Sequence, residues 1–258
     1  LVSTSFLHPM VATRLQKAGV QIAFRANLGF CLGGYRDLSL LLLSCPEVSQ
    51  IQCSLVLLND SNLLLQSPQV LIRLLHGWIA AEEGSSAPVL AGLTDSVERG
   101  CYHLQSFLLY ANRALLNHPG WLRFWLQLRI DGSKDDLINY GEIGLSQALI
   151  KDGVLLKPSY PLVAGLLQDP ALGEELLQYD IYQPQQVNQS LFAWRSLLAR
   201  GYPFVKKHVL FNLIEHKDQP MTIAQLARLL PSDRSDLIVE DIHKLLISRY
   251  SGDSPAMD

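Results

Sequence analysis

Residues 54–61 read SLVLLNDS, a continuous apolar run followed at once by three polar residues. An apolar run without alternation is typical of a strand that is covered on both faces. The same pattern recurs at residues 20–27 (VQIAFRAN) and 88–95 (PVLAGLTD). We therefore expect strands at 20–24, 54–58 and 88–93, each ending at polar side chains.

The segments around these runs predict helices and two further strands. Apolar residues at helical spacing predict helices at 37–43, 69–81, 119–128 and 142–151, and short β-rich runs predict strands at 104–110 and 154–156. Strands that alternate with helices indicate an α/β domain with a mostly parallel sheet flanked by helices. In such sheets ligands bind beyond the carboxyl ends of the strands, where the polar clusters lie.

The pattern changes after about Pro161. Leucine-rich helical segments interrupted by prolines follow, and no strand pattern is clear. We expect two parts, an α/β domain at 1–162 and a helical C-terminal extension at 163–258. The opening LVST is typical of the end of a buried strand, so we also expect a strand and a helix upstream of Leu1.

Composition excludes several classes of protein. The chain has 258 residues, of which 48% are hydrophobic, enough for a sizeable core, and its net charge of −3 argues against a nucleic-acid binder. No apolar stretch reaches the ~20 residues that cross a bilayer, so we expect no transmembrane segment. The four cysteines lack CxxC spacing and are expected to be buried, reduced thiols of a cytosolic protein: Cys31, Cys45, Cys53 and Cys101.

Residues 25–37, RANLGFCLGGYRD, place three glycines between a predicted strand and helix. Glycine permits tight turns and a close approach to a ligand, and amides at a helix N-terminus can hold phosphate. Arg25 offers a charged fork to a diphosphate. Asn27 and Gly29 belong to the same loop. The alternative is an ordinary glycine-rich loop, which composition alone favours.

Asn59, Asp60 and Ser61 end the strand predicted at 54–58. A carboxylate at this place can hold a hard cation, Mg²⁺ or Mn²⁺, that in turn binds a diphosphate. The alternative is a polar turn or a helix cap. The local sequence leaves these two possibilities even.

Two later motifs carry further polar residues, GLTDS at 92–96 with HLQSF at 103–107, and YGEIGLS at 140–146. Asp95 and His103 can bind sugar hydroxyls, although a lone histidine is more often structural. Glu142 opens a predicted helix, where the dipole favours a carboxylate. Its functional role would be that of a general base, and its alternative role that of a helix-capping acid.

The order of these motifs resembles that of the rhamnan synthesis protein F family of glycosyltransferases. This family has an R-x-N-x-G-x-D-x-G segment, then NDS, GLTDS with HLQS, an E-x-G-L-[ST] helix and a PF-[IV]-K element, which is PFVK at 203–206 here. The resemblance covers about residues 1–208. It implies a GT-A-like fold and inverting transfer of a sugar, often rhamnose from deoxythymidine-diphosphate rhamnose, to a growing bacterial polysaccharide.

The resemblance also implies roles for single residues. The donor would be bound by Arg25, Asn27, Gly29, Asn59, Asp60 and Ser61, with Asp60 as the metal ligand. The sugar or acceptor would be bound by Asp95, His103, Gln105 and Lys206, and Glu142 would be the catalytic base.

The implied partners are a nucleotide sugar and a glycan or lipid-linked glycan. The implied place is the cytoplasm, with peripheral association at the inner face of the cell membrane.

Two departures from the family motivate a second hypothesis, Cys31 and the segment expected upstream of Leu1. The acid of the family's first motif falls on Cys31, which cannot replace a carboxylate on ribose or metal. The alternative function is therefore a catalytically inactive homologue that binds a glycan or a partner transferase.

Overall fold

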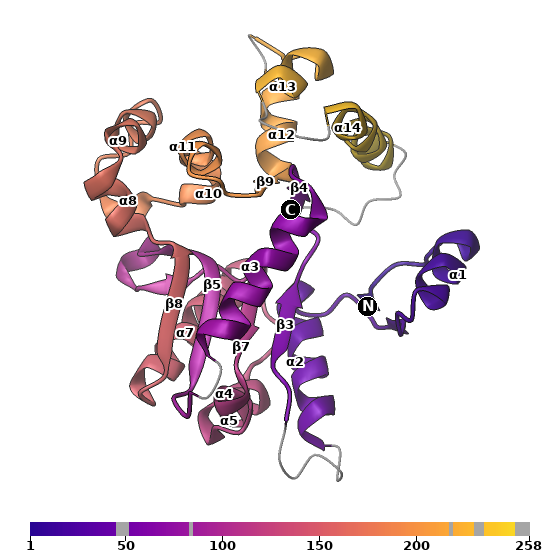
Figure 1. The fold of residues 1–258 in the computed structure, drawn as a ribbon, viewed down its shortest axis with the longest axis vertical. Helices are drawn as coiled ribbons and strands as arrows, with labels where there is room; N and C mark the ends of the chain where they lie inside the picture. The colour runs from indigo at the N-terminus through magenta and orange to yellow at the C-terminus, as the bar shows by residue number, and fades with distance from the viewer. Residues whose placement is uncertain (45–51, 83–84, 217–218, 230–234, 251–258) are drawn as a thin grey trace.

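The computed structural model describes residues 1–44, 52–82, 85–216, 219–229 and 235–250 (Figure 1). Its centre is a sheet in the order β3-β7-β5-β6, and β8 pairs with β5 outside this path. The strands are β3 (Leu55–Leu58), β5 (Val89–Ser96), β6 (His103–Leu104), β7 (Leu108–Ala111) and β8 (Leu155–Tyr160). The α/β class is confirmed.

The sheet is mixed, so the prediction of a mostly parallel sheet is wrong. β7 is antiparallel to both β3 and β5, β6 is antiparallel to β5, and only β8 is parallel to β5. Only residues 97–102, with the short turn η2 (Glu98–Gly100), join β5 to β6. A parallel neighbour needs a crossover of a dozen or more residues, so this connection can only form a hairpin.

Strand directions nevertheless bring three carboxyl ends to one edge of the sheet. β3 and β5 both oppose β7 and β8 follows β5, so β3, β5 and β8 point the same way. The segment that precedes β7 reaches the same edge. Polar side chains at these ends can therefore lie together, as expected from the sequence.

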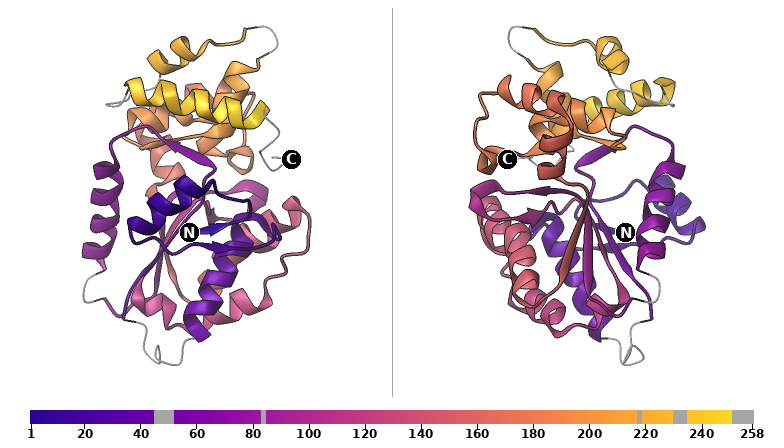
Figure 2. Two further views of the ribbon diagram at one scale, coloured as in Figure 1. Left: turned by 90° about the vertical axis from the view of Figure 1, so that its right-hand side faces the viewer. Right: turned by 60° about the vertical axis from the view of Figure 1, so that its left-hand side comes forward.

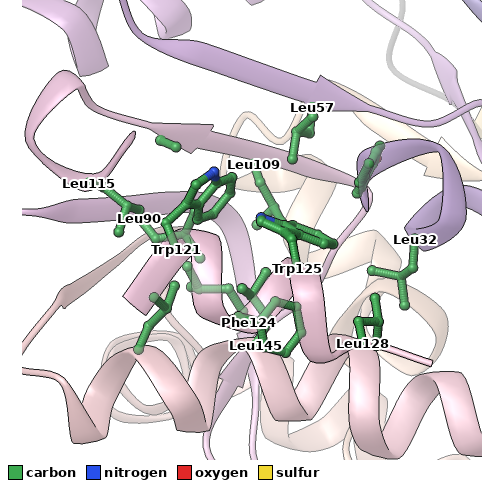
Figure 3. Close-up of a cluster of buried hydrophobic side chains, with 14 of the residues drawn as sticks. Leu32, Leu57, Leu90, Leu109, Leu115, Trp121, Phe124, Trp125, Leu128 and Leu145 are labelled. Atoms are coloured by element: carbon green, nitrogen blue, oxygen red, sulfur yellow. The ribbon is translucent and has the colours of Figure 1, made fainter. Parts of the chain in front are cut away.

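Helices cover the two faces of the sheet unequally. α2 (Phe30–Ser44), α5 (Pro119–Gln127) and α7 (Gly144–Lys151) lie on one face, and α3 (Pro68–Ala81) lies on the other (Figure 2). On the three-helix face, Trp121 and Trp125 are 0% exposed and their rings meet edge to face at 5.3 Å. Figure 3 shows these rings among the leucines of the core. By contrast, α3 has no buried residue.

Most predicted elements are present with different bounds. The helices predicted at 69–81 and 119–128 are α3 and α5, and the helix predicted at 37–43 is the longer α2. The segment predicted as one helix at 142–151 is a π-helix, η3 (Leu137–Ile143), followed by α7. The strand predicted at 104–110 is broken into β6 and β7.

Two strand predictions need correction. The run at 20–24 gives only β2 (Ala23–Phe24). β2 pairs in parallel with β1 (Val2–Ser3) in a separate two-stranded sheet, and helix α1 (Pro9–Lys17) connects the two strands. The run at 54–58 is not covered on both faces, because Leu57 alone in β3 is buried. β3 ends the strand order of the sheet, which explains its exposure.

Over its described residues, the C-terminal part is helical apart from one strand. It contains α8 (Leu162–Gln168), α9 (Pro170–Leu177), η4 (Pro184–Gln186), α10 (Gln189–Phe192), α11 (Trp194–Ala199), α12 (Lys207–Ile214), α13 (Ile223–Leu229) and α14 (Ser235–Tyr250). The strand is β9 (Phe204–Lys206), which pairs with β4 (Asn62–Leu64). A second apolar core joins Leu93 and Phe107 of the sheet region to Trp194 of α11. The extension is thus packed onto the edge where the three strands end (Figure 1).

Two further predictions concern the burial of the cysteines and the absence of a transmembrane helix. Cys31 and Cys101 are half-buried and Cys53 is exposed, so the expectation of buried thiols is wrong for Cys53; Cys45 lies outside the described residues. Within the described ranges, every helix is too short or too polar to cross a bilayer.

Candidate functional site

Glu142 is held at the sheet edge by the turn between β6 and β7. The backbone N–H of Ser106 donates to Glu142 Oε2 at 2.7 Å, and the Ser106 hydroxyl donates to the same oxygen. Tyr35 donates to the Ser106 carbonyl at 3.2 Å and Asn59 donates its N–H to the Phe107 carbonyl at 3.0 Å, so the turn itself is fixed. The Glu142 side chain remains 20% exposed, with Oε1 available.

Glu142 lies in the π-helix η3, which runs directly into α7. A π-helical segment inside a helix is rare and is often found at functional sites. A helix-capping role is not supported, because Glu142 lies within this continuous helical segment and its side chain contacts Ser106. The local sequence YGEIGLS gives no sign of this change in helix type.

His103 lies beside Glu142 and is almost fully buried, with 1% of its side chain exposed. Its Nδ1 is 2.8 Å from the carbonyl oxygen of Cys101, and its Nε2 is 3.8 Å from Glu142 Oε1. β6 places it there through its pairing with Ser96 of β5. The sequence therefore predicted two residues, Glu142 and His103, that the fold brings together from segments far apart in the chain.

Asn188, from the extension, binds several polar groups of this edge. Its Oδ1 accepts from Gln105 Nε2 at 2.9 Å, from the Ser190 hydroxyl at 2.8 Å and from Lys206 Nζ at 3.4 Å. Its Nδ2 donates to Glu98 Oε2 at 3.1 Å. Asn188 thus links η2 and β9 to Gln105, which follows β6, so the extension helps to build the site.

The charges of Glu98, Glu142 and Lys206 influence one another. Burial lowers the pKa of Lys206, and the two carboxylates oppose that shift. Burial raises the pKa of Glu98; His103 and Lys206 lower it, and Glu142 adds to the rise. We refer to Glu98, His103, Gln105, Ser106, Glu142, Asn188 and Lys206 as the Glu142 cluster.

Cys31 lies at the start of α2, close to the Glu142 cluster. Burial raises the pKa of its thiol; a hydrogen bond with Asn59 lowers that pKa and the Glu142 carboxylate raises it. The thiol is therefore neutral near pH 7, and a neutral thiol is a poor nucleophile and a poor metal ligand.

The predicted metal ligand Asp60 lies at the surface and faces Lys207. Its side chain is 99% exposed and its Oδ2 is 3.3 Å from Lys207 Nζ. Asn59 and Ser61 form a local turn, in which Asn59 Oδ1 accepts from the Ser61 N–H at 3.0 Å and from its hydroxyl at 2.6 Å. Among the described residues, no three His, Cys, Asp or Glu side chains are grouped to hold a metal ion. This donor set does not fit a metal ion held by the protein.

The predicted donor loop is tied to α2. Arg25 Nε donates to Asp37 Oδ2 at 2.8 Å, while its buried Nη1 has no hydrogen-bond partner among the described residues. Gly29 has φ +74°, and a Cβ on it would lie 2.6 Å from the side chain of Ile130, so glycine is needed for the turn itself. Asn27 is exposed in the same loop.

Asp95 has hydrogen-bond partners that Glu142 does not share. Its Oδ1 accepts from the Leu162 N–H at 2.7 Å and from Gln189 Nε2 at 3.2 Å, and the residue is 4% exposed. Gln189 Nε2 also donates to the carbonyls of Asp95 and Tyr160, each at 3.0 Å. This geometry attaches the extension to β5 and gives the predicted sugar contact of Asp95 no support.

Of the predicted site residues, the fold gathers His103, Gln105, Glu142 and Lys206, with Asn59 beside them. Sequence reasoning missed Glu98, Ser106 and Asn188. Ser106 belongs to the quoted HLQSF segment, but the strand predicted at 104–110 included it and hid the turn between β6 and β7. Glu98 and Asn188 carry no local signal, because only the packing of the extension brings them to this edge.

A hollow at the opposite edge, beyond Asn112 at the end of β7, is lined by His76 and Ile79 of α3 and by Tyr110. It shares no residue with the Glu142 cluster. Comparison of the chain with family models, with curated proteins and with solved structures finds no match.

Proposed function

We propose that this protein is a glycosyltransferase that moves a sugar from a nucleotide-diphosphate donor to a hydroxyl group of a glycan. The observation that supports this most is Glu142: one carboxylate oxygen is fixed by Ser106, and the other is open beside His103. A fixed carboxylate with one free oxygen is suited to accept a proton from a hydroxyl group.

In the proposed reaction, the acceptor hydroxyl oxygen attacks the anomeric carbon of the donor sugar and a new C–O bond forms. Glu142 Oε1 takes the hydroxyl proton. The bond between the anomeric carbon and the diphosphate oxygen breaks, and its electron pair leaves with the nucleoside diphosphate. A single displacement inverts the anomeric configuration.

Lys206 is suited to offset charge on the departing diphosphate. Its ammonium group lies in the field of Glu142 and Glu98, and its hydrogen bond to Asn188 is long, at 3.4 Å. Among the described residues, Asn188 is the hydrogen-bond partner of the Lys206 ammonium group, so two of its three N–H donors remain for a ligand. A positioned cation is a usual means of stabilising a phosphate leaving group.

The sequence resemblance supplies the finer part of the proposal. It implies a rhamnose or a related hexose as the donor sugar, and a growing cell-surface polysaccharide or lipid-linked glycan as the acceptor. It also implies that the protein acts in the cytoplasm, at the inner face of the membrane. The fit of Asp60 to a divalent cation is poor, so metal dependence would require ligand oxygens from the donor.

A donor panel tests the proposal. The protein is incubated with common nucleotide-diphosphate sugars, deoxythymidine-diphosphate rhamnose among them, and with methyl pyranosides as acceptors. We expect release of nucleoside diphosphate and a glycoside of inverted anomeric configuration by NMR. Absence of transfer and of donor hydrolysis with every donor would contradict the proposal.

A second candidate rests on Cys31, a neutral thiol where the resembling family has an acid. In this candidate the chain is an inactive homologue that binds a glycan or a partner transferase. Calorimetry with nucleoside diphosphates separates the two, because micromolar binding favours the enzyme. No binding of any nucleotide, together with binding of a glycan, favours the inactive homologue.

A further inference from the structure

The ring of His103 has one nitrogen whose role is fixed and one that has no partner. Nδ1 faces the Cys101 carbonyl oxygen at 2.8 Å, and a carbonyl can only accept, so Nδ1 carries a proton. In the neutral ring, Nε2 is then an acceptor. Among the described residues, no hydrogen-bond donor reaches this buried atom.

The nearest charged atom to Nε2 is itself an acceptor. Glu142 Oε1 lies 3.8 Å away, beyond hydrogen-bonding distance. Its partner Oε2 is already occupied by the N–H and hydroxyl of Ser106. Lys206 does not fill the gap, because its ammonium group bonds to Asn188 and to neither of these two atoms. Two acceptors without a donor therefore lie 3.8 Å apart, Glu142 Oε1 on a side chain that is 20% exposed and His103 Nε2 buried behind it.

We propose that His103 Nε2 and Glu142 Oε1 together recognise two neighbouring hydroxyl groups of the acceptor sugar, a vicinal diol. The inference rests on the proposed function and names its acceptor class. The attacking hydroxyl donates to Glu142 Oε1, and the hydroxyl on the adjacent ring carbon donates to His103 Nε2. His103 is then a specificity-determining residue that touches the substrate.

A diol fits this pair of atoms better than a single hydroxyl does. One hydroxyl has one proton, so it would leave the second acceptor buried and unsatisfied, which costs free energy. Hydroxyl groups on adjacent ring carbons are near neighbours and supply one donor to each atom. A site that is built to bond a hydroxyl rejects an analogue that lacks it.

Two substitutions separate the functions of the two ring nitrogens. In His103→Asn, the side-chain amide can still donate to the Cys101 carbonyl, but nothing occupies the place of Nε2. In His103→Gln, the longer side chain brings an amide oxygen towards the place of Nε2. Thermal unfolding midpoints of both variants, compared with that of the wild-type protein, separate a change in specificity from a loss of folded protein.

The test compares acceptors rather than total activity. The methyl pyranoside that the wild-type protein glycosylates best is compared with its monodeoxy analogues that lack a hydroxyl adjacent to the attacking one. We expect wild-type kcat/KM to fall at least about tenfold for one such analogue. His103→Asn should use parent and analogue nearly equally, and His103→Gln should regain part of the preference.

A wild-type protein that uses the parent and every such analogue equally would overturn the diol proposal alone, and would indicate that a water molecule satisfies His103. An equal loss with all acceptors in His103→Asn would also overturn it. Failure of the wild-type protein to transfer to any acceptor would overturn the proposed function and this inference with it. ¹⁵N NMR gives a check without activity: a neutral ring with its proton on Nε2 would contradict the assignment.

Discussion

Two carboxylates at the same edge of the sheet, Asp95 and Glu142, have opposite environments. Asp95 is 4% exposed and its Oδ1 accepts from Leu162 and Gln189. Glu142 is 20% exposed; one oxygen is occupied by Ser106, and the other faces the unpartnered nitrogen of His103. A polar residue at a strand end is therefore not by itself a site residue.

The difference comes from the extension. Leu162 and Gln189 belong to segments that pack onto β5, and both donate hydrogen bonds to the Asp95 carboxylate. These bonds hold the extension against the sheet, so Asp95 has a structural role. Glu142 receives its partner only from the neighbouring turn. A carboxylate with satisfied oxygens serves stability, whereas one that keeps an open oxygen is available to a ligand.

The largest effect on stability is expected at Asp95. Asp95→Ala leaves the buried Leu162 N–H without its acceptor, and we expect a loss of about 2–4 kcal/mol in the free energy of unfolding. Asp95→Asn keeps an acceptor oxygen and should cost less than about 1 kcal/mol. Urea unfolding of both variants measures the difference. A stable Asp95→Ala protein that has lost only transfer would place Asp95 in the site instead.

A second prediction concerns the support of Glu142. Gly29 precedes α2, the helix whose Tyr35 donates to the turn that holds Glu142. Gly29 has φ +74°, and a Cβ there would lie 2.6 Å from Ile130. Gly29→Ala should therefore cost about 1–3 kcal/mol of stability.

The matched control for Gly29→Ala is Gly77→Ala in α3. A Cβ on Gly77 would meet nothing within 4 Å. We expect this substitution to be neutral or to stabilise the protein by up to about 1 kcal/mol, because alanine is the better helix former. Equal unfolding midpoints for the two variants would contradict the strain assigned to Gly29.

The smallest expected effect is a pH dependence. Burial is the main cause of the raised pKa of Asp95, which lies above its ordinary 3.8; the hydrogen bond from Leu162 partly offsets it. The protonated form is thus favoured in the fold. Its stabilising contribution is complete below the unfolded pKa and is lost as pH rises through the folded pKa.

Asp95→Asn has no such proton to lose, so it isolates this contribution. Relative to wild type, the Asn variant should become more stable as pH rises from about 3 towards 7. Urea midpoints for both proteins across that range give the difference directly. A relative stability that falls with pH would show that the ionised form of Asp95 is the one favoured in the fold.

The sequence predicted much of this edge of the sheet, but it did not distinguish the two carboxylates. Apolar periodicity located α3 and α5, because spacing on a helix is local information. The antiparallel direction of β6 was missed, although the connection at residues 97–102 is too short for a crossover. Glu98 and Asn188 could not be predicted, since they reach the Glu142 cluster only through packing between distant segments.

The most direct test of the account is the rate of sugar transfer by Glu142→Gln beside Asp95→Asn, in a single assay. Glutamine keeps an oxygen for Ser106 but cannot take a proton, so we expect turnover to fall about 10²–10⁴-fold with little change in unfolding. Asp95→Asn should stay close to wild type. Turnover by Glu142→Gln within about tenfold of wild type would contradict the account, because proton transfer then cannot depend on that carboxylate.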